Sequence, residues 1–184
     1  VYRNNREKII AQASQMQDIF SKINQRSAVL NQPLLPFVDK IISYLDKEHG
    51  SFKGAPKFPQ FYLFDAMFYF YLKTNDEKYL KPVETLLKNI CSKGIYDQLA
   101  GGIARYTVDD KWIIPHFEKM LYDNIQFGSL LSKFYQSTKS DYFKKKLTQT
   151  INYINTEFVN DIGLYGSAYD ADSEGVEGKF YTWS

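Results

Sequence analysis

Apolar residues recur at intervals of three and four positions along most of this chain, which is the spacing of amphipathic helices. The pattern predicts six helices, over about residues 5–23, 37–45, 60–72, 75–90, 117–134 and 142–154. The third segment is apolar nearly all round, as expected for a helix that packs on several sides. After residue 163 the pattern changes to turns and short strands. The sequence therefore predicts an all-α fold with a short β segment near its C-terminal end.

Four residues mark expected helix boundaries or breaks. Gly50 follows the second helix and suits the C′ position, where a left-handed backbone conformation favours glycine. Thr74 and Glu77 have the spacing of a capping box at the start of the fourth helix. Pro82 lies within that helix and should kink it or delay its start, because proline has no N–H to donate.

A short pattern of glycine, one residue and an aromatic closes a pair of helices three times. It occurs at Gly50-Ser51-Phe52, Gly94-Ile95-Tyr96 and Gly163-Leu164-Tyr165. Each copy opens a loop rich in glycine and polar side chains, over about 54–59, 96–118 and 166–178. A unit repeated in this way predicts an array of helical hairpins whose elaborate loops share one end. The array would gather polar and aromatic residues of distant segments around one mouth.

The loop before the fifth helix contains the groups best suited to proton transfer. Its first part, residues 96–109, is already longer than the 2–8 residues usual between helices. Pro115 suits a helix start, so His116, Glu118 and Lys119 would lie in the first turn. His116 and Glu118 are therefore candidate catalytic residues. In the structural alternative, Glu118 stabilises the helix dipole and His116 is hydrogen-bonded within a packed loop.

A second group of carboxylates lies near the C-terminal end and adds three candidate catalytic residues. Asp170, Asp172 and Glu174 alternate with small residues, as in the first half of a calcium-binding EF-hand loop. The twelfth position is Tyr181, where such a loop needs a bidentate glutamate, so no calcium site is predicted. These carboxylates either accept hydrogen bonds from loop amides or face the cleft. In the cleft they would complement Glu118 and supply the acid and base that glycoside hydrolysis requires.

Two cations lie in loops stiffened by glycine and proline. Lys57 and Arg105 could hold a carboxylate, a phosphate or a sugar hydroxyl. Alternatively, they could pair with Asp97 or Asp123 and join the loops to one another. The full set of candidate substrate-binding residues is Lys57, Phe58, Asp97, Gln98, Arg105, Tyr106, Trp112, Lys119 and Asp123.

Composition and charge limit the class of protein. The 184 residues suit a single domain over 1–184, and the aromatic share of 17% suits helix packing or a cleft lined with rings. The net charge is only +2, and the one basic run, 144–146, is expected on a solvated helix face, so no nucleic-acid partner is predicted. No stretch is apolar enough for a membrane span.

The chemistry-bearing motifs are also limited. The single cysteine, Cys91, excludes an internal disulfide and fits a cytoplasmic protein. Zinc-ligand spacing, a phosphate-binding loop and a serine-centred elbow are all missing from the sequence, so no metal or cofactor is predicted. The chain begins at Val1 and stops at Ser184 within a strand-like pattern, which predicts a piece of a larger protein. We expect apolar faces that later helices should cover, and self-association of this piece through them.

Five separated blocks of the chain, in this order, resemble one known family. They are Gly54-Ala55-Pro56-Lys57-Phe58-Pro59, Gly94-Ile95-Tyr96-Asp97-Gln98, Arg105-Tyr106, the run from Pro115 to Asp123, and Asp170-Ala171-Asp172-Ser173-Glu174-Gly175. From about residue 50 to its end the chain resembles the spermatogenesis-associated thioredoxin-domain proteins. The resemblance implies a thioredoxin-like domain followed by a helical toroid similar to N-acylglucosamine 2-epimerases and six-hairpin glycosidases. This chain would then be the first part of that (α/α) toroid, with the thioredoxin-like domain as a partner in the same full-length protein.

Two positions depart from the family pattern. The family usually has a histidine directly before the Arg-Tyr pair, where this chain has Ala104. It also usually has a glutamate before the Asp-Ala-Asp motif, where this chain has Tyr169. A catalytic role for either side chain in relatives would imply an altered or inactive protein here.

Two functions are consistent with these features. The first is an enzyme module that acts on a carbohydrate or related polyol by isomerisation, epimerisation or hydrolysis, with His116 and Glu118 as the main proton-transfer residues. The alternative is a non-catalytic binding or scaffold module whose partner is the thioredoxin-like domain or another protein. An enzyme predicts carboxylates that converge around a cleft, whereas a scaffold predicts loops locked into mutual salt bridges.

Overall fold

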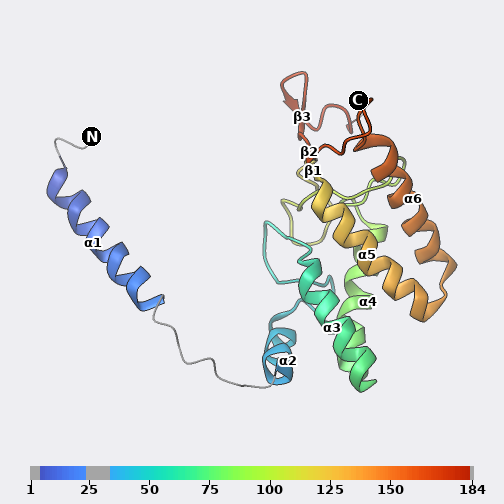
Figure 1. Ribbon diagram of the computed structural model, residues 1–184, viewed down its shortest axis with the longest axis horizontal. Coiled ribbons are helices and arrows are strands. Elements are labelled where there is room, and N and C mark those ends of the chain that lie inside the picture. The colour runs from blue at the N-terminus through green and yellow to red at the C-terminus, as the bar shows by residue number, and fades with distance from the viewer. Residues whose placement is uncertain (1–4, 24–33, 183–184) are drawn as a thin grey trace. The chain divides into compact units, whose positions relative to one another are not determined.

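The computed structural model describes residues 5–23 and 34–182 (Figure 1). By its internal contacts the chain divides into two compact units, residues 1–34 and 35–184. The first unit contains helix α1 (Arg6–Ile23), with Glu7 in its first turn and Lys22 in its last, as the helix dipole favours. The single domain over 1–184 stays a prediction.

Five further helices are described after α1. They are α2 (Leu34–Tyr44), α3 (Phe61–Thr74), α4 (Glu77–Ser92), α5 (Leu121–Thr138) and α6 (Asp141–Glu157). With α1 they match the six helices that the apolar pattern predicts, and the all-α prediction is confirmed. Helix-forming periodicity is a local property of the chain, which explains why it could be recognised without tertiary information.

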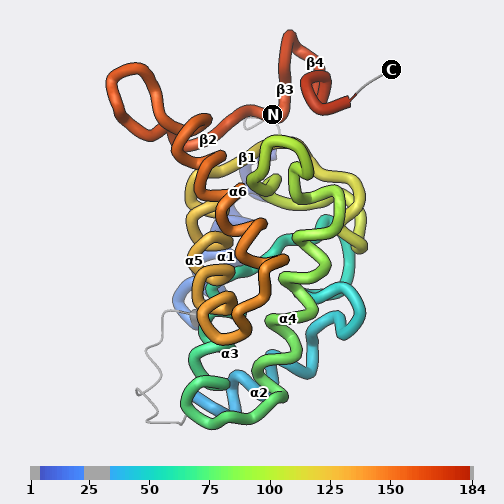
Figure 2. The backbone as a smooth tube through the Cα atoms, turned by 90° about the vertical axis from the view of Figure 1, so that its right-hand side faces the viewer, coloured from blue at the N-terminus to red at the C-terminus, as the bar shows by residue number. Residues whose placement is uncertain are grey.

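Four helices of the second unit, α3 to α6, form two antiparallel hairpins. α3 packs on α4, α5 packs on α6, and α3 also lies beside α5. Figures 1 and 2 show α3 and α5 in one layer and α4 and α6 in the other. Links of two residues, 75–76 and 139–140, join the helices of each hairpin. There Asn75 and Lys139 adopt the left-handed conformation and donate their N–H groups to carbonyls one turn earlier. The long loops therefore all lie at the opposite end.

The core lies between these helices and is mainly aliphatic and aromatic. Fully or almost fully buried side chains come from α3 (Phe64, Met67, Phe68), α4 (Val83, Leu86, Leu87, Ile90) and α5 (Phe127, Leu130, Leu131, Phe134). Each contributes about 1.5–3 kcal/mol when removed from water. Other apolar side chains on the same helices stay exposed, including Tyr62, Tyr69, Leu72 and Ile125. Self-association through such faces stays a prediction.

Two short antiparallel strand pairs complete the described fold. β1 (Lys119–Met120) pairs with β2 (Ala168–Tyr169). β3 (Asp172–Ser173) pairs with β4 (Val176–Glu177) to form a small hairpin. The predicted short β segment is therefore present, and its first strand joins the C-terminal segment to the start of α5.

The expected end of the second helix is wrong. α2 ends at Tyr44, before Gly50, because Leu45 pairs with Phe52 across an antiparallel bridge. Gly50 lies in the turn of that bridge with φ 77°, and a Cβ there would lie 2.8 Å from the Cα of Leu86. Glycine is therefore needed both for its conformation and for the close approach of α4.

The start of α4 also differs from the expected capping box. The N-cap is Asp76, whose side chain accepts a hydrogen bond from the Lys78 amide. Thr74 instead ends α3 and donates its hydroxyl to a carbonyl of that helix. Threonine and aspartate are both favoured N-cap residues, so propensity alone could not decide between Thr74 and Asp76, two positions apart. α4 continues through Pro82, so the proline does not delay the start of the helix.

The expected start of the fifth helix at Pro115 is also wrong. α5 begins at Leu121, and residues before it pair with neighbouring loops instead of forming a helical turn. Thr107 forms an antiparallel bridge to Pro115, and the Arg105 amide donates to the Glu118 carbonyl. These long-range hydrogen bonds satisfy the backbone in an extended conformation, which outweighs the local preference of proline for a helix start.

The repeat is real, but its register differs from the one expected. After α2, α4 and α6 the chain forms a turn in which the Asp46, Asp97 or Asn160 side chain accepts two backbone N–H groups. The corresponding glycines, Gly50, Gly101 and Gly163, all have positive φ. Gly101 therefore takes the place predicted for Gly94.

Candidate functional site

The elaborate loops meet at one end of the helical layers. Lys57 pairs with Thr107 across an antiparallel bridge, which joins the 54–59 loop to the 96–118 loop. β1 and β2 then join the latter to the C-terminal segment, as Figure 1 shows near the top of α5 and α6. Predicted site residues from all three loops are therefore brought together, although they are up to 117 positions apart, from Lys57 to Glu174.

An aromatic stack runs along one side of this loop region. The ring centroids of Phe58 and Tyr106 are 4.7 Å apart, and those of Tyr106 and His116 are 4.6 Å apart. The His116 side chain is about 29% exposed, and its Nδ1 lies 2.8 Å from a carboxylate oxygen of Glu177. With a proton on Nδ1, this carboxylate would hold the ring orientation and leave Nε2 available to a substrate.

Glu177 was not among the candidate site residues. It lies on β4, 61 positions from His116, and no local spacing relates the two. Glu118 instead accepts a hydrogen bond of 3.1 Å from Arg105. The predicted pairing of Arg105 with Asp97 or Asp123 is therefore corrected to a pairing with Glu118.

A small hollow lies beside the Arg105–Glu118 pair. Its volume is about 280 Å³, and we call it the Arg105 hollow; its lining is Phe58, Pro59, Gln60, Phe61, Tyr62, Arg105, Tyr122, Asp123 and Gln126. Rings and hydrogen-bonding groups alternate around it. Arg105 is partly exposed and donates from one guanidinium nitrogen to Glu118, which leaves further guanidinium N–H groups for a ligand.

Asp123 is the most unusual residue of the Arg105 hollow. It is only 9% exposed, and its Oδ2 has no hydrogen-bond partner among the described residues. Burial raises the pKa of this carboxyl to about 6, although the charge of Arg105 and the Tyr122 hydroxyl oppose the shift. An unpartnered buried carboxylate is costly to folding and is concentrated at functional sites.

We expect Asp123→Asn to stabilise the protein at high pH and to leave stability nearly unchanged at pH 4. A carboxyl whose folded pKa is raised stabilises the fold below its unfolded pKa, and this contribution is lost as pH rises through about 6. At 1.36 kcal/mol per unit, the rise from 3.8 to about 6 predicts a gain of up to about 3 kcal/mol at pH 8. Denaturation at the two pH values measures it, with Asp65→Asn, a partly exposed pair with Lys133, as the control.

Lys57 and Trp112, both predicted to bind substrate, are buried and form hydrogen bonds within the fold. Lys57 is 1% exposed, and its ammonium donates to Asp46 and to the Phe52 carbonyl at 2.9 and 2.8 Å. Trp112 is completely buried, and its indole N–H donates to the His49 carbonyl at 2.7 Å. One sequence feature could have identified Asp46, since Asp46 and Asp97 each stand four positions before a glycine of a repeated turn.

Lys119 repeats the arrangement of Lys57 in the next hairpin. Its ammonium donates to Asp97 at 2.8 Å and to the Gly101 carbonyl at 3.2 Å, and it lies 4.3 Å from the ring centroid of Tyr153. Burial alone would raise the pKa of Asp97, but hydrogen bonds from Lys119 and from loop amides lower it below the usual value. Lys119 and Asp97 therefore hold the loop together, although they also line a second hollow.

That second hollow has a volume of about 440 Å³ and contains two of the predicted carboxylates, Asp170 and Asp172. Glu174 lies in the turn between β3 and β4, where it pairs with Lys179. These three acidic residues are exposed and do not line the Arg105 hollow. The three carboxylates therefore lie outside the Arg105 hollow.

Gln98 and Lys146 contact each other within the fold. Gln98 was predicted to bind substrate, and Lys146 was predicted to lie on a solvated helix face. The Gln98 amide donates to three backbone carbonyls, and its oxygen accepts from Lys146 at 2.7 Å. Lys146 is only 8% exposed and lies 4.1 Å from the ring centroid of Tyr96. The expectation that the whole 144–146 run is solvated is therefore wrong at its last residue.

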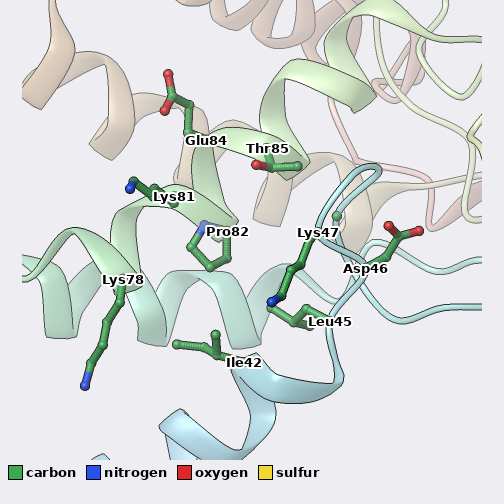
Figure 3. Close-up of a pocket in the computed structure, with 10 residues that line it drawn as sticks. Ile42, Leu45, Asp46, Lys47, Lys78, Lys81, Pro82, Glu84 and Thr85 are labelled. Carbon is green, nitrogen blue, oxygen red and sulfur yellow. The ribbon is translucent and has the colours of Figure 1, made fainter.

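A larger hollow than these two lies between α2 and α4 (Figure 3). Its volume is about 490 Å³, and its lining contains none of the predicted site residues: Ile42, Leu45, Asp46, Lys47, Gly50, Lys78, Lys81, Pro82, Glu84 and Thr85. In the described part of the chain, no group of three or more His, Cys, Asp or Glu side chains is placed to hold a metal ion. None of the helices described in residues 5–23 and 34–182 is long and apolar enough to cross a membrane.

Two antiparallel hairpins in a double layer, with their long loops at one end, define this unit as part of an (α/α) toroid. Solved structures share the arrangement. The cellobiose 2-epimerase of Spirochaeta thermophila matches 85% of this chain and 40% of its own, with TM-score 0.63 and 18% identity. A sugar epimerase from a ruminal bacterium matches 83% of this chain and 40% of its own, with TM-score 0.62 and 19% identity. A family 76 glycoside hydrolase from Bacteroides thetaiotaomicron matches 65% of this chain and 25% of its own, with TM-score 0.55 and 19% identity. At these identities the likeness shows the fold alone.

Sequence relatives identify the family. Spermatogenesis-associated protein 20 of the rat is 34% identical over 149 residues, 76% of this chain, and the human protein is 32% identical over the same length. An uncharacterised protein of Caenorhabditis elegans is 34% identical over 154 residues. No protein-family model matches the chain. The chain belongs to the spermatogenesis-associated protein 20 family, as the five sequence blocks indicate, and it spans about a fifth of the length of these relatives, 19–21%.

Proposed function

We propose that this part of the toroid binds a sugar or related polyol and contributes to its isomerisation, epimerisation or hydrolysis. The observation that carries the proposal is the Arg105 hollow, where aromatic faces, a cation, amides and a carboxyl line a space of about 280 Å³. Sugars present both apolar C–H faces and hydroxyl groups, so such a mixed lining suits them. The proposal includes a cytoplasmic location, because the single thiol, Cys91, is buried and unpaired.

His116 and Glu118 remain the main proton-transfer candidates of the proposal. His116 meets the two geometric requirements, since it is partly exposed and a carboxylate, Glu177, contacts only its Nδ1. Glu118 lies at the edge of the same region, where it accepts a hydrogen bond from Arg105, and it is the candidate general base. Asp170, Asp172 and Glu174 are secondary candidates at the neighbouring hollow.

A library of sugars and sugar phosphates, screened by thermal shift on the full-length protein, tests this function. We expect at least one neutral monosaccharide or disaccharide to raise the melting temperature, because ligands that bind only the folded state stabilise it. Substitution of Arg105 by methionine should remove the shift. Lys133→Met, at a partly exposed residue about two turns further along α5, should keep it. Shifts in the melting temperature that only sugar phosphates cause would indicate an anionic substrate in place of a neutral polyol. Complete absence of shifts would reject the proposal.

A specific observation also favours a second candidate, a non-catalytic scaffold for the thioredoxin-like domain. Three ion pairs, Lys57–Asp46, Arg105–Glu118 and Lys119–Asp97, lock the loops together, as that alternative predicts. Ala104 and Tyr169 add to it, because they replace residues usual in the family. A pull-down of this region by the separately expressed thioredoxin-like domain, in the absence of any sugar-induced stabilisation, would favour the scaffold.

A further inference from the structure

The role of Asp123 remains to be explained within the Arg105 hollow. Its neighbour Asn124 uses its side chain fully, accepting from the Ile103 amide and donating to the carbonyls of Ile103 and Met120. Asp123 is equally a residue of the first turn of α5, yet its Oδ2 is buried and unpartnered among the described residues. Folded proteins rarely leave such an atom without a partner, so the position is one where a ligand group would complete the hydrogen bonding.

The groups that face Asp123 determine the form in which it meets a ligand. Arg105 favours the ionised carboxylate, as does the Tyr122 hydroxyl, whereas Glu118 and burial favour the neutral acid. The remaining lining, from the 54–59 loop and α3, supplies Phe58, the Gln60 amide and the Tyr62 phenol rather than a further cation. Arg105 is itself paired with Glu118, so its charge is already partly compensated.

The shape of the hollow limits the ligand to a small molecule. A space of about 280 Å³ lies at the lower end of the roughly 300–1,000 Å³ usual for ligand pockets. This volume suits one sugar ring better than an oligosaccharide. Phe58 is partly exposed, so its free face can lie against the C–H face of such a ring, with Tyr106 supporting its other side.

We infer that Asp123 contacts the sugar directly and that its neutral carboxyl donates a hydrogen bond to a hydroxyl or ring oxygen of one pyranose ring. The inference rests on the proposed function and adds a binding residue, a ring-sized ligand and a pH dependence to it. A neutral carboxyl supplies one O–H donor, which an ionised carboxylate lacks. Binding is therefore strong while Asp123 is protonated and weakens as the pH rises and it ionises.

Calorimetric titration of the full-length protein with D-glucose, D-mannose, N-acetylglucosamine and cellobiose, at pH 5 and pH 7.5, tests the inference. If only the neutral form of Asp123 binds, a pKa of about 6 predicts that affinity for the best monosaccharide falls about thirtyfold between these values. Asp123→Asn keeps a donor at the same position at every pH, so the affinity of this variant for the sugar should differ by less than about twofold between pH 5 and pH 7.5. Asp65→Asn, one turn further along α3 where Asp65 pairs with Lys133, should retain the wild-type pH dependence.

The outcomes separate this inference from the function on which it rests. The pH dependence must persist in His116→Asn; its disappearance there, with persistence in Asp123→Asn, would overturn the inference. Sugar binding that is equally strong at both pH values would overturn it and leave the proposed function intact. Tighter binding at pH 7.5 would show that the carboxylate acts as an acceptor and would also overturn it. Absence of binding by all four sugars at both pH values would overturn both.

Discussion

Lys57→Ala should lower the free energy of unfolding by about 3–5 kcal/mol, because it leaves a partly buried carboxylate without its cation. The Lys57 and Asp46 side chains are only 1% and 14% exposed, and their charged atoms lie 2.9 Å apart. Burial alone would raise the pKa of Asp46, but hydrogen bonds from the His49 amide and Lys57 lower it below its usual value. The pair therefore joins the turn after α2 to the 54–59 loop and helps to position Phe58, the next residue of that loop.

Chemical denaturation of the full-length protein measures this loss. The matched control is Lys88→Ala, which removes an exposed pair with Glu84 on α4 and should cost no more than about 0.5 kcal/mol. Lys57→Met should recover part of the loss, since an apolar side chain fills the site without a second buried charge. A Lys57→Ala protein of normal stability that no longer binds sugar would instead restore Lys57 as a substrate anchor.

His116→Asn should reduce turnover of the substrate about 10²- to 10⁴-fold, which is the usual contribution of a general acid or base. The substitution keeps the approximate size and one hydrogen-bonding group near Glu177, but it removes proton transfer near neutral pH. Its effect on stability should stay below about 1 kcal/mol, because the His116–Glu177 pair is solvent-exposed on both sides, at 29% and 53%.

Turnover and melting temperature of the full-length protein decide between the catalytic and structural roles. Glu177→Gln should lower turnover less than His116→Asn, since it disturbs the orientation of the ring without removing it. The second histidine offers a control, because the His49 side chain lies outside the loop stack and His49→Asn should leave turnover unchanged. An active His116→Asn protein that is destabilised by about 1–3 kcal/mol would end the catalytic proposal, as expected when a buried partner is left unsatisfied.

The candidate site was predictable only in part. Arg105, Tyr106, His116 and Phe58 were expected from their loops and do lie together, because a hairpin array places loops of alternate connections at one end. The pairing of His116 with Glu177 was not predictable, since the two residues are 61 positions apart and only the fold brings them together. Trp112 illustrates the opposite error. An aromatic residue in a polar loop suggests a ligand contact, but the fold buries it completely over the turn after α2.

The sequence by itself determined the six helices, the hairpin arrangement and the family, because helical periodicity, glycine turns and ordered motif blocks are all encoded in short segments. The tertiary structure decided the register of the repeat, the extended conformation before α5 and the partners of the buried charged groups Lys57 and Lys119. The backbone bridge between Thr107 and Pro115 outweighed the local preference of Pro115 for a helix start. Burial similarly decided the state of Asp123, since a carboxyl on a helical first turn is ordinarily solvated and ionised, and only the packing of α3, α5 and the Arg105 loop removes water from it.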